Sequence, residues 1–178
     1  MNNQDMNRNA FSIVELLVVV VVLGIVAAMA IPQFSQAAVD QDQVNLKTDL
    51  AVLRTAIEMY YHDHGAYPGQ KDTGDASAPA GSPSAFVQQL TLYSDAAGCV
   101  SEASSARFRF GPYLHNGIPP CPVSVGRPST GFHLITGNAI PAFTPTVTSA
   151  GWVFNVETGY LAANSPGMDK AGTRYDTY

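Results

Sequence analysis

The most constraining feature of this chain is a long apolar run close to its first residue. From Phe11 to Ile31 only one side chain ionises, that of Glu15, and Pro32 follows the run directly. A helix rises about 1.5 Å per residue, so about twenty apolar residues are needed to cross the hydrocarbon core of a bilayer. The run therefore predicts a helix that spans a membrane or lies in the core of an assembly.

Glu15 is the exception within this run, and it has two interpretations. A carboxylate deep in hydrocarbon costs on the order of 2–3 kcal/mol. A plain membrane anchor has no reason to retain such a residue, which indicates that Glu15 has a partner. Ser12 and Glu15 also have the spacing of a capping box, at a helix start where the helix dipole favours negative charge. Capping and pairing are compatible, so the sequence leaves both open.

Helical periodicity continues beyond Pro32, but now on one face only. Apolar residues recur at intervals of three, four or seven, which is typical of an amphipathic helix, and Gly65 ends the pattern. We therefore expect one long helix from Ser12 to His64. Pro32 lacks a backbone N–H donor, which predicts a bend there. The stripe consists of Val39, Leu46, Leu50, Leu53, Ile57 and Tyr60.

Residues 65–178 predict a loop-rich head of the α+β class. Residues 70–83 are rich in Gly, Ala, Ser, Pro and Asp, which is typical of a surface loop. Ser82 before Pro83 predicts a capped short helix that ends near Leu90 or Leu92. The remaining patterns predict a strand at 132–135, a hairpin of residues 152–156 and 160–162, and an irregular segment from 164 to 178. The expected fold is a long helix packed on a small antiparallel sheet.

The N-terminal pattern resembles that of type IV pilins and of type II secretion pseudopilins. That family has a short polar leader, then Phe, a Glu at mature position five, an apolar helix and a Pro about twenty residues in. Here these features are Phe11, Glu15 and Pro32. The resemblance implies that prepilin peptidase cuts between Ala10 and Phe11 and that Phe11 is then N-methylated. The family nearly always has Gly before the cut, so Ala10 is a departure that affects the expected efficiency of processing.

The head also resembles that of the major pseudopilins, in a helix that ends near Tyr-Pro, a Gly-Pro-Tyr-Leu segment and a late hairpin. These are residues 53–60 with Tyr67-Pro68, residues 111–114 and residues 152–159. The domains implied are a leader (1–10), a transmembrane or filament-core half of the helix (11–31), an amphipathic half (32–64) and a globular head (65–178).

The resemblance implies a structural subunit of a type II secretion pseudopilus, not an enzyme. Its expected partners are further copies and other pseudopilins or pilins, prepilin peptidase and an inner-membrane assembly platform. Glu15 of one subunit is expected to pair with the Phe11 amine of a neighbour. The expected location is the inner membrane, single-pass, with the head in the periplasm or outside the cell. Two alternatives stay open: a type IV pilin of a surface fibre, and a membrane-anchored periplasmic binding or adhesion domain that never polymerises.

Two other interpretations of the N-terminus also stay open. In an ordinary secretory signal peptide, Arg8 would supply the charge, residues 13–26 the apolar core and Ala28-Met29-Ala30 the cleavage site. The mature chain would then begin at Ile31 instead of Phe11. Against this, signal peptides avoid a charge such as Glu15 within the apolar core. The other interpretation is an uncleaved anchor.

Composition and motifs argue against several other functions. The net charge is −5 and no basic stripe is present, so nucleic-acid binding is not favoured. The sequence contains no nucleotide-binding glycine loop, nucleophile elbow or metalloprotease motif. His62 and His64 are expected to be polar residues at a fraying helix end, and His115 and His133 to be isolated. Tyr60, Tyr61 and Tyr67 are expected to pack between the helix and the head.

Cysteines and C-terminal acids give two weaker expectations. In an oxidising compartment Cys99 and Cys121 could form a disulfide worth on the order of 3 kcal/mol, and two separate thiols are the alternative. No cofactor is expected. Major pseudopilins often bind calcium in an acidic C-terminal loop, and Ca²⁺ needs six to eight oxygen ligands. The weak candidates for such a site are Asn164, Ser165, Asp169 and Asp176.

Overall fold

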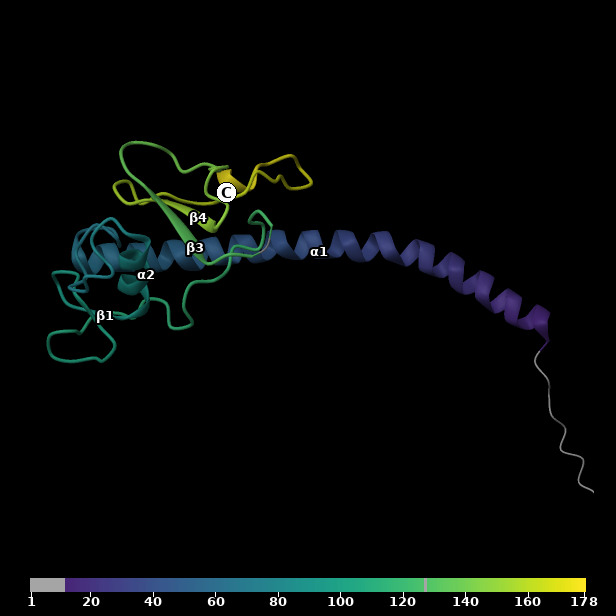
Figure 1. Cartoon of the computed structure of the whole chain (residues 1–178), viewed down its shortest axis with the longest axis horizontal. Coiled ribbons are helices and arrows are strands. Elements are labelled where there is room, and N and C mark those ends of the chain that lie inside the picture. The colour runs from purple at the N-terminus through teal and green to yellow at the C-terminus, as the bar shows by residue number, and fades with distance from the viewer. Residues whose placement is uncertain (1–11, 127) are drawn as a thin grey trace, which may run out of the picture. The chain divides into compact units, whose positions relative to one another are not determined.

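The computed structural model describes residues 12–126 and 128–178, and of residues 29–38 it describes the backbone alone. The chain divides into two compact units, one up to Gln41 and one from Asp42 to Tyr178. The expected α+β class is confirmed: a long helix precedes a small three-stranded sheet and a second, two-stranded sheet (Figure 1).

Helix α1, Ile13–His64, is 52 residues long and agrees with the predicted helix to within one residue at its start. It continues through Pro32, so the predicted bend there stays a prediction. At its C-terminus Gly65 adopts a φ of 65°, and its amide donates to the Tyr61 carbonyl at 2.8 Å. A left-handed glycine is a common way for a helix to end, because it satisfies a carbonyl that the helix itself leaves unpaired.

One face of α1 in the second unit forms a wall of the core. Leu46, Leu50, Leu53, Ile57 and Tyr60 are all buried, as the stripe predicted. Their spacing brings them onto one side of the helix, against α2 and the larger sheet. Val39 differs from the prediction, because it belongs to the first unit and is 46% exposed.

Helix α2, Pro83–Thr91, confirms the predicted short helix and its cap. The Ser82 hydroxyl accepts a hydrogen bond from the Ala85 amide at 3.1 Å, which satisfies a donor at the helix start. Phe86 and Leu90 lie on its buried face. The ring of Phe86 packs 4.3 Å from that of Phe132 and 4.8 Å from that of Phe154. Helix α2 is thereby joined to the sheet through aromatic contacts.

The larger sheet has the order β3-β4-β5, with β3 at Gly131–Ile135, β4 at Ala150–Asn155 and β5 at Leu161–Ala163. The predicted hairpin is confirmed, since β4 and β5 are antiparallel. The pairing of β3 with β4 is parallel, so the sheet is mixed and not wholly antiparallel as expected. Residues 136–149 form the connection that parallel pairing requires, returning the chain to the same end of the sheet.

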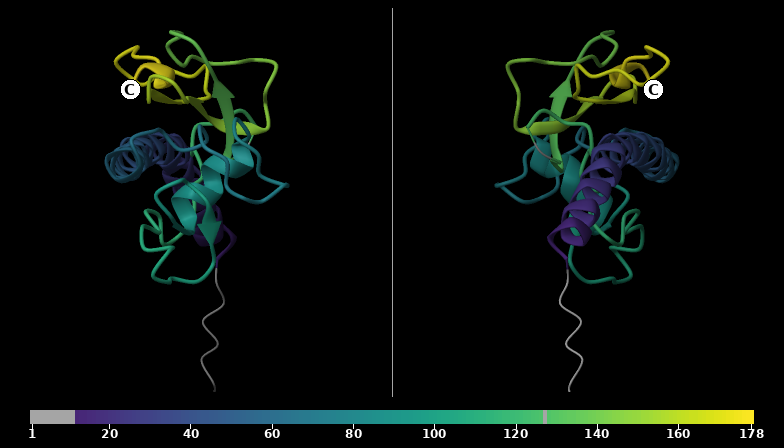
Figure 2. Two further views of the ribbon diagram at one scale, coloured as in Figure 1. Left: turned by 90° about the vertical axis from the view of Figure 1, so that its left-hand side faces the viewer. Right: turned by 90° about the vertical axis from the view of Figure 1, so that its right-hand side faces the viewer.

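A smaller antiparallel pair lies elsewhere in the head. It consists of β1, Tyr93–Ser94, and β2, Val100–Ser101. The chain ends in a short 3₁₀ helix, η1, Tyr175–Thr177, beside β5. Within the head, the C-terminal segment (yellow) and the loop that follows β2 (teal-green) lie on opposite sides (Figure 2).

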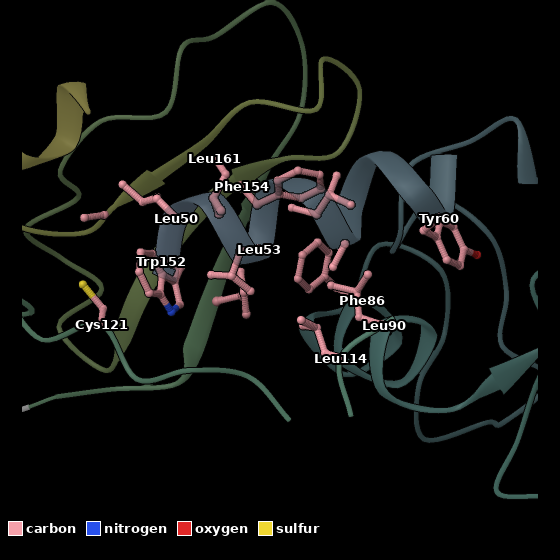
Figure 3. Packing of buried hydrophobic residues seen from close by; sticks show 14 of the residues in the cluster. Leu50, Leu53, Tyr60, Phe86, Leu90, Leu114, Cys121, Trp152, Phe154 and Leu161 are labelled. Atoms are coloured by element: carbon pink, nitrogen blue, oxygen red, sulfur yellow. The ribbon is translucent and has the colours of Figure 1, made fainter. Parts of the chain in front are cut away.

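All six residues of β4 are buried, so both faces of this central strand are covered. Trp152 is completely buried and donates its indole N–H to the Pro119 carbonyl at 3.0 Å. Figure 3 shows Leu50 and Leu53 of α1 facing Trp152 and Phe154, with Phe86 and Leu90 of α2 closing the cluster. The sheet therefore packs against α1 and α2, which both come earlier in the chain.

Two glycines are needed because other groups approach them closely. A Cβ on Gly151 of β4 would lie 2.1 Å from the Ser129 carbonyl oxygen. A Cβ on Gly159, in the turn between β4 and β5, would lie 2.3 Å from the Tyr67 ring, and Gly159 also has a φ of 76°. Neither contact leaves room for a side chain, so each glycine permits a packing that alanine would disrupt.

Candidate assembly surface

The first part of α1 exposes apolar side chains in every direction. Residues 12–28 are all exposed, although most of them are apolar. Exposure of the large apolar side chains runs from 48% at Val19 to 83% at Ile13. A helix that is apolar all round is normally buried, in a large core or in a membrane. This surface is the candidate site, and its large members are Ile13, Val14, Leu16, Leu17, Val18, Val19, Val20, Val21, Val22, Leu23, Ile25 and Val26.

Within the part of the chain that the structure describes, no helical stretch combines the length and the apolarity required of a membrane span.

Ser12 and Glu15 form the polar start of this surface. The Ser12 hydroxyl accepts from the Val14 amide at 3.3 Å, and the Ser12 carbonyl accepts from the Leu16 amide at 3.2 Å. The hydroxyl therefore caps the amide of the second helical residue. A capping box would require the amide of the third, so this contact is an ordinary N-cap. Glu15 lies in the first turn, where the helix dipole favours its negative charge.

Several predicted site residues lie outside the described part of the chain. Ala10 and Phe11, the expected cleavage and methylation residues, are not described, and neither is the side chain of Pro32. Pairing of Glu15 with a neighbouring Phe11 therefore stays a prediction.

In the second unit, α1 lines a groove on the outside of the head. A hollow of about 960 Å³ lies between α1, the β4–β5 turn, residues 140–142 and the C-terminal residues. Arg54 crosses it from the helix and donates to the Leu161 carbonyl at 2.9 Å and to the Tyr178 carbonyl. Ile140 and Tyr160 project at its rim. This open, largely apolar hollow suits contact with a protein better than it suits chemistry on a small substrate.

His64 is placed differently from the sequence expectation. It is only 7% exposed, and its ring stacks on Tyr60 with centroids 4.0 Å apart. Its Nδ1 faces the Tyr60 carbonyl at 3.0 Å, so Nδ1 carries the proton, and Nε2 then accepts from the Ser94 hydroxyl at 3.1 Å. Burial lowers the pKa of His64. One signal in the sequence could have indicated this burial: His64 lies four residues after Tyr60, so the two share a helix face.

The other histidine of this pair and three tyrosines agree with expectation. His62 is exposed, as a residue at a helix end is expected to be. The rings of Tyr61 and Tyr67 stack with centroids 4.5 Å apart. Tyr60 is fully buried in the core. The tyrosines therefore pack between the helix and the head, as predicted.

The two cysteines are both free thiols, so the disulfide expectation is wrong in this structure and the alternative of separate thiols holds. They belong to different parts of the head. Cys99 lies beside Gly74 in the loop that leads to β2, and its backbone contacts Asp95. Cys121 is buried in the main core cluster, where burial raises its pKa to about 11. Sequence distance alone does not decide whether two Cα atoms approach closely enough for a bond.

The C-terminal calcium candidates each have internal partners. Asn164 and Ser165 are buried, and Asn164 bridges residues 144, 147 and 150 through its side-chain amide. Asp176 pairs with Arg174, and Asp169 accepts from backbone amides and from Tyr178. Among the residues described, no group of three or more His, Cys, Asp or Glu side chains is placed to hold a metal ion.

With this geometry in place, the N-terminal segment can be compared with known families. Residues 5–31 match the prokaryotic N-terminal methylation motif, and this range includes Phe11, Glu15 and all of the exposed apolar surface. The resemblance to pilin-like proteins that the sequence predicted is therefore confirmed.

Relatives of two kinds are similar to the chain. The type II secretion system core protein G of Pseudomonas aeruginosa is 36% identical over 83 residues, which cover 45% of this chain and 58% of the relative. The protein of the same name from Aeromonas hydrophila is 32% identical over 41% of this chain and 51% of the relative. The type IV major pilin protein PilE1 of Neisseria gonorrhoeae is 31% identical over 48% of this chain and 40% of the relative.

The similarity is partial in every case. The chain spans about half the length of the curated relatives it matches. No solved structure matches this chain.

Proposed function

We propose that this protein is a structural subunit of a type II secretion pseudopilus. The observation that carries the proposal is a helical segment, residues 12–28, whose apolar side chains are exposed on all sides and interrupted by one carboxylate. Such a surface requires a partner that covers it completely, and lateral contact with identical helices does so. The methylation motif and the similarity to core protein G support a pseudopilin over other helical assemblies.

In this proposal the precursor waits in the inner membrane with its head in the periplasm. Prepilin peptidase removes residues 1–10 and methylates Phe11, and an inner-membrane platform then adds the subunit to the filament. The segment from 11 to 31 passes from lipid into the filament core. Both environments are apolar, so the transfer leaves the large side chains without contact with water.

Glu15 acts in this scheme through the amine of Phe11 on a neighbouring copy. Each of these two charges alone would be costly in an apolar core, and together they neutralise each other. A subunit displaced along the filament would leave both charges unpaired. The pair therefore specifies the stagger of the helices more than it adds stability.

The test compares Glu15→Ala with Glu102→Ala, which changes an exposed glutamate in a loop of the head. The first variant should insert in the membrane as the wild type does and lose most of its filaments, because the stagger is no longer specified. The second should assemble normally. Filaments are counted by electron microscopy of sheared cells, and normal filaments from Glu15→Ala would remove the pairing role.

Processing is tested separately by Ala10→Trp, which puts a bulky side chain at the proposed cleavage site. The uncut precursor should accumulate, and N-terminal sequencing of the wild type should begin at Phe11. A first residue of Ile31 would instead support an ordinary signal peptide. A mature-sized product from Ala10→Trp would exclude a cut at this position.

A second candidate is a type IV pilin of a surface fibre, which the similarity to PilE1 favours. The two candidates share the proposed helix packing and differ in the length of the filament. Long fibres at native expression would support the surface pilin, and short filaments that form only on overexpression would support the pseudopilin. A protein that forms no filament at any expression level would be a membrane-anchored binding or adhesion domain.

A further inference from the structure

The C-terminal segment 164–178 is held by side-chain contacts centred on Asp169. Its Oδ1 accepts from the amides of Ala171 and Thr173, both at 2.8 Å, which closes a tight turn. Its Oδ2 accepts from the Tyr178 hydroxyl at 2.6 Å. Both oxygens of this carboxylate are therefore engaged by donors from within the segment itself.

Tyr178 carries these contacts across to α1. Its hydroxyl accepts from the Gln43 side chain at 2.8 Å, and the Gln43 amide nitrogen also lies 3.3 Å from Oδ2 of Asp169. The Lys47 ammonium lies over the Tyr178 ring, 4.9 Å from its centroid, and Arg54 donates to the Tyr178 carbonyl. Three residues along one side of α1 thus bind a single tyrosine (the yellow segment in Figure 1).

Asp176 and Asn164 are satisfied in a similar way. Arg174 donates to Asp176 from Nε at 2.9 Å and from Nη2 at 2.5 Å, and the Phe143 amide donates to the same carboxylate at 3.0 Å. The side-chain oxygen of Asn164 accepts from the Thr144 amide at 2.8 Å. The side-chain oxygens of Asp176 and Asn164, which were named from the sequence as candidate calcium ligands, therefore already accept hydrogen bonds from within the protein.

These residues do not fit the calcium site that the family resemblance implies. Ca²⁺ requires six to eight oxygens directed at one point. Here the carboxylates are directed at N–H and O–H donors, and Arg174 occupies one side of Asp176. Hydrogen bonds from Tyr178 and Thr173 lower the pKa of Asp169, and the positive charge of Lys47 lowers it further by a smaller amount. A divalent cation would have to displace these donors and lie close to positive charge.

We infer that the C-terminal segment is fastened to α1 by a tyrosine–aspartate latch, formed by Tyr178 and Asp169 with Gln43 and Lys47, and that this latch takes the place of a bound cation. The inference concerns the head alone and does not depend on the proposed filament function. It makes the order of residues 164–178 independent of calcium and dependent in part on the Tyr178 hydroxyl.

The first experiment compares Tyr178→Phe with Tyr160→Phe in the full-length chain in detergent micelles. Tyr160 is 62% exposed, so it controls for loss of a hydroxyl outside the latch. Amide exchange of residues 164–178, followed by mass spectrometry, should quicken at least about fivefold in Tyr178→Phe, because the hydroxyl loses its hydrogen bonds to Asp169 and from Gln43. It should be unchanged in Tyr160→Phe. Equal exchange in both variants and the wild type would overturn the latch.

The second experiment measures the same exchange in the wild type with calcium chloride and with EDTA. The two rates should agree, and calcium should not restore protection in Tyr178→Phe. Slower exchange with calcium in the wild type, or saturable heat of calcium binding by calorimetry, would overturn the inference that the latch takes the place of a cation. Neither outcome would bear on filament formation, which is tested by Glu15→Ala.

Discussion

The two parts of α1 are both rich in apolar residues, yet their surroundings are opposite. In residues 12–28 every side chain is exposed, whereas from Asp42 to His64 the apolar residues of one face are buried by the head. The difference follows from the arrangement of apolar residues and not from their number. An all-round apolar surface cannot be covered by one small head, while a single stripe can. In the proposed function other molecules cover the first part, whereas the head buries one face of the second.

The largest expected effect comes from truncating matched leucines in the two parts. Leu53→Ala should lower the free energy of unfolding of the head by about 3 kcal/mol, because it removes a buried side chain and leaves a cavity. Leu17→Ala should change it by less than about 0.5 kcal/mol, since Leu17 belongs to the first unit and is 60% exposed. Denaturation followed by fluorescence of Trp152, the single tryptophan, measures both. A comparable loss of unfolding free energy in both variants would show that the two parts of α1 do not differ in how they are covered.

A smaller effect is expected from Gly159→Ala, which tests how tightly the hairpin packs against Tyr67. The new methyl group would collide with the Tyr67 ring, and a loss of about 2 kcal/mol is expected from the collision and the positive φ together. Gly137→Ala is the control, with a φ of 78° and open space around it. It should lose about 1 kcal/mol, from backbone strain alone. Equal losses in urea denaturation would mean that the Tyr67 contact is not tight.

The buried His64 should make the head less stable in mild acid. Burial lowers its pKa in the folded state, so the unfolded chain binds a proton first as the pH falls through about 6.5. The free energy of unfolding should therefore decline below that pH. His64→Gln should flatten this decline, and His62→Gln, whose parent side chain is 89% exposed, should not. Urea midpoints between about pH 7 and pH 5 measure the slope.

A separate acid transition should occur at lower pH. Burial alone would raise the pKa of Asp95, but hydrogen bonds from Arg107 and from backbone amides lower it overall, and the same holds for Asp176 with Arg174. Their stabilisation is present above the ordinary aspartate pKa and is lost as the pH falls through the lower folded value. If the free energy of unfolding declines only in this lower pH range, and not as the pH falls through about 6.5, then His64 contributes nothing to the pH dependence.

The smallest effect contrasts the caps of the two helices. Ser82→Ala should cost about 1 kcal/mol of head stability, because the start of α2 is part of the core. Ser12→Ala should leave head stability unchanged and loosen only the first turn of α1. Thermal melting measures the first effect, and amide exchange at residues 13–16 measures the second. Loss of head stability in Ser12→Ala would show that the first turn of α1 and the head are energetically coupled.

Local patterns in the sequence predicted most of the elements. The stripe from Leu46 to Tyr60, the Ser82 cap and the β4–β5 hairpin depend on neighbours within a few residues, and all three were confirmed. The parallel pairing of β3 and β4 was missed because strand direction depends on a connection, residues 136–149, that has no clear local pattern. The burial of His64 was missed for a similar reason, since Ser94 and Phe110 come from distant parts of the chain.

The candidate assembly surface was visible in the sequence because it needs no tertiary contact. Its definition is a run of apolar residues, one acid and a family motif, and each of these can be read in order along the chain. The C-terminal network was not visible. In the sequence Asp169 was a calcium candidate and Tyr178 belonged to a segment expected to be irregular. Only the structure places Gln43, more than a hundred residues earlier, beside both.

The sequence by itself determined where the helices start, which face of the amphipathic half is buried and which segment is apolar on all sides. These properties follow from the order of polar and apolar groups over one or two helical turns. Only the tertiary structure decided that the cysteines stay apart, that β3 runs parallel to β4 and that the acids of the C-terminal segment have internal partners. Such features depend on which distant segments meet, and that outcome is set by packing of the whole core.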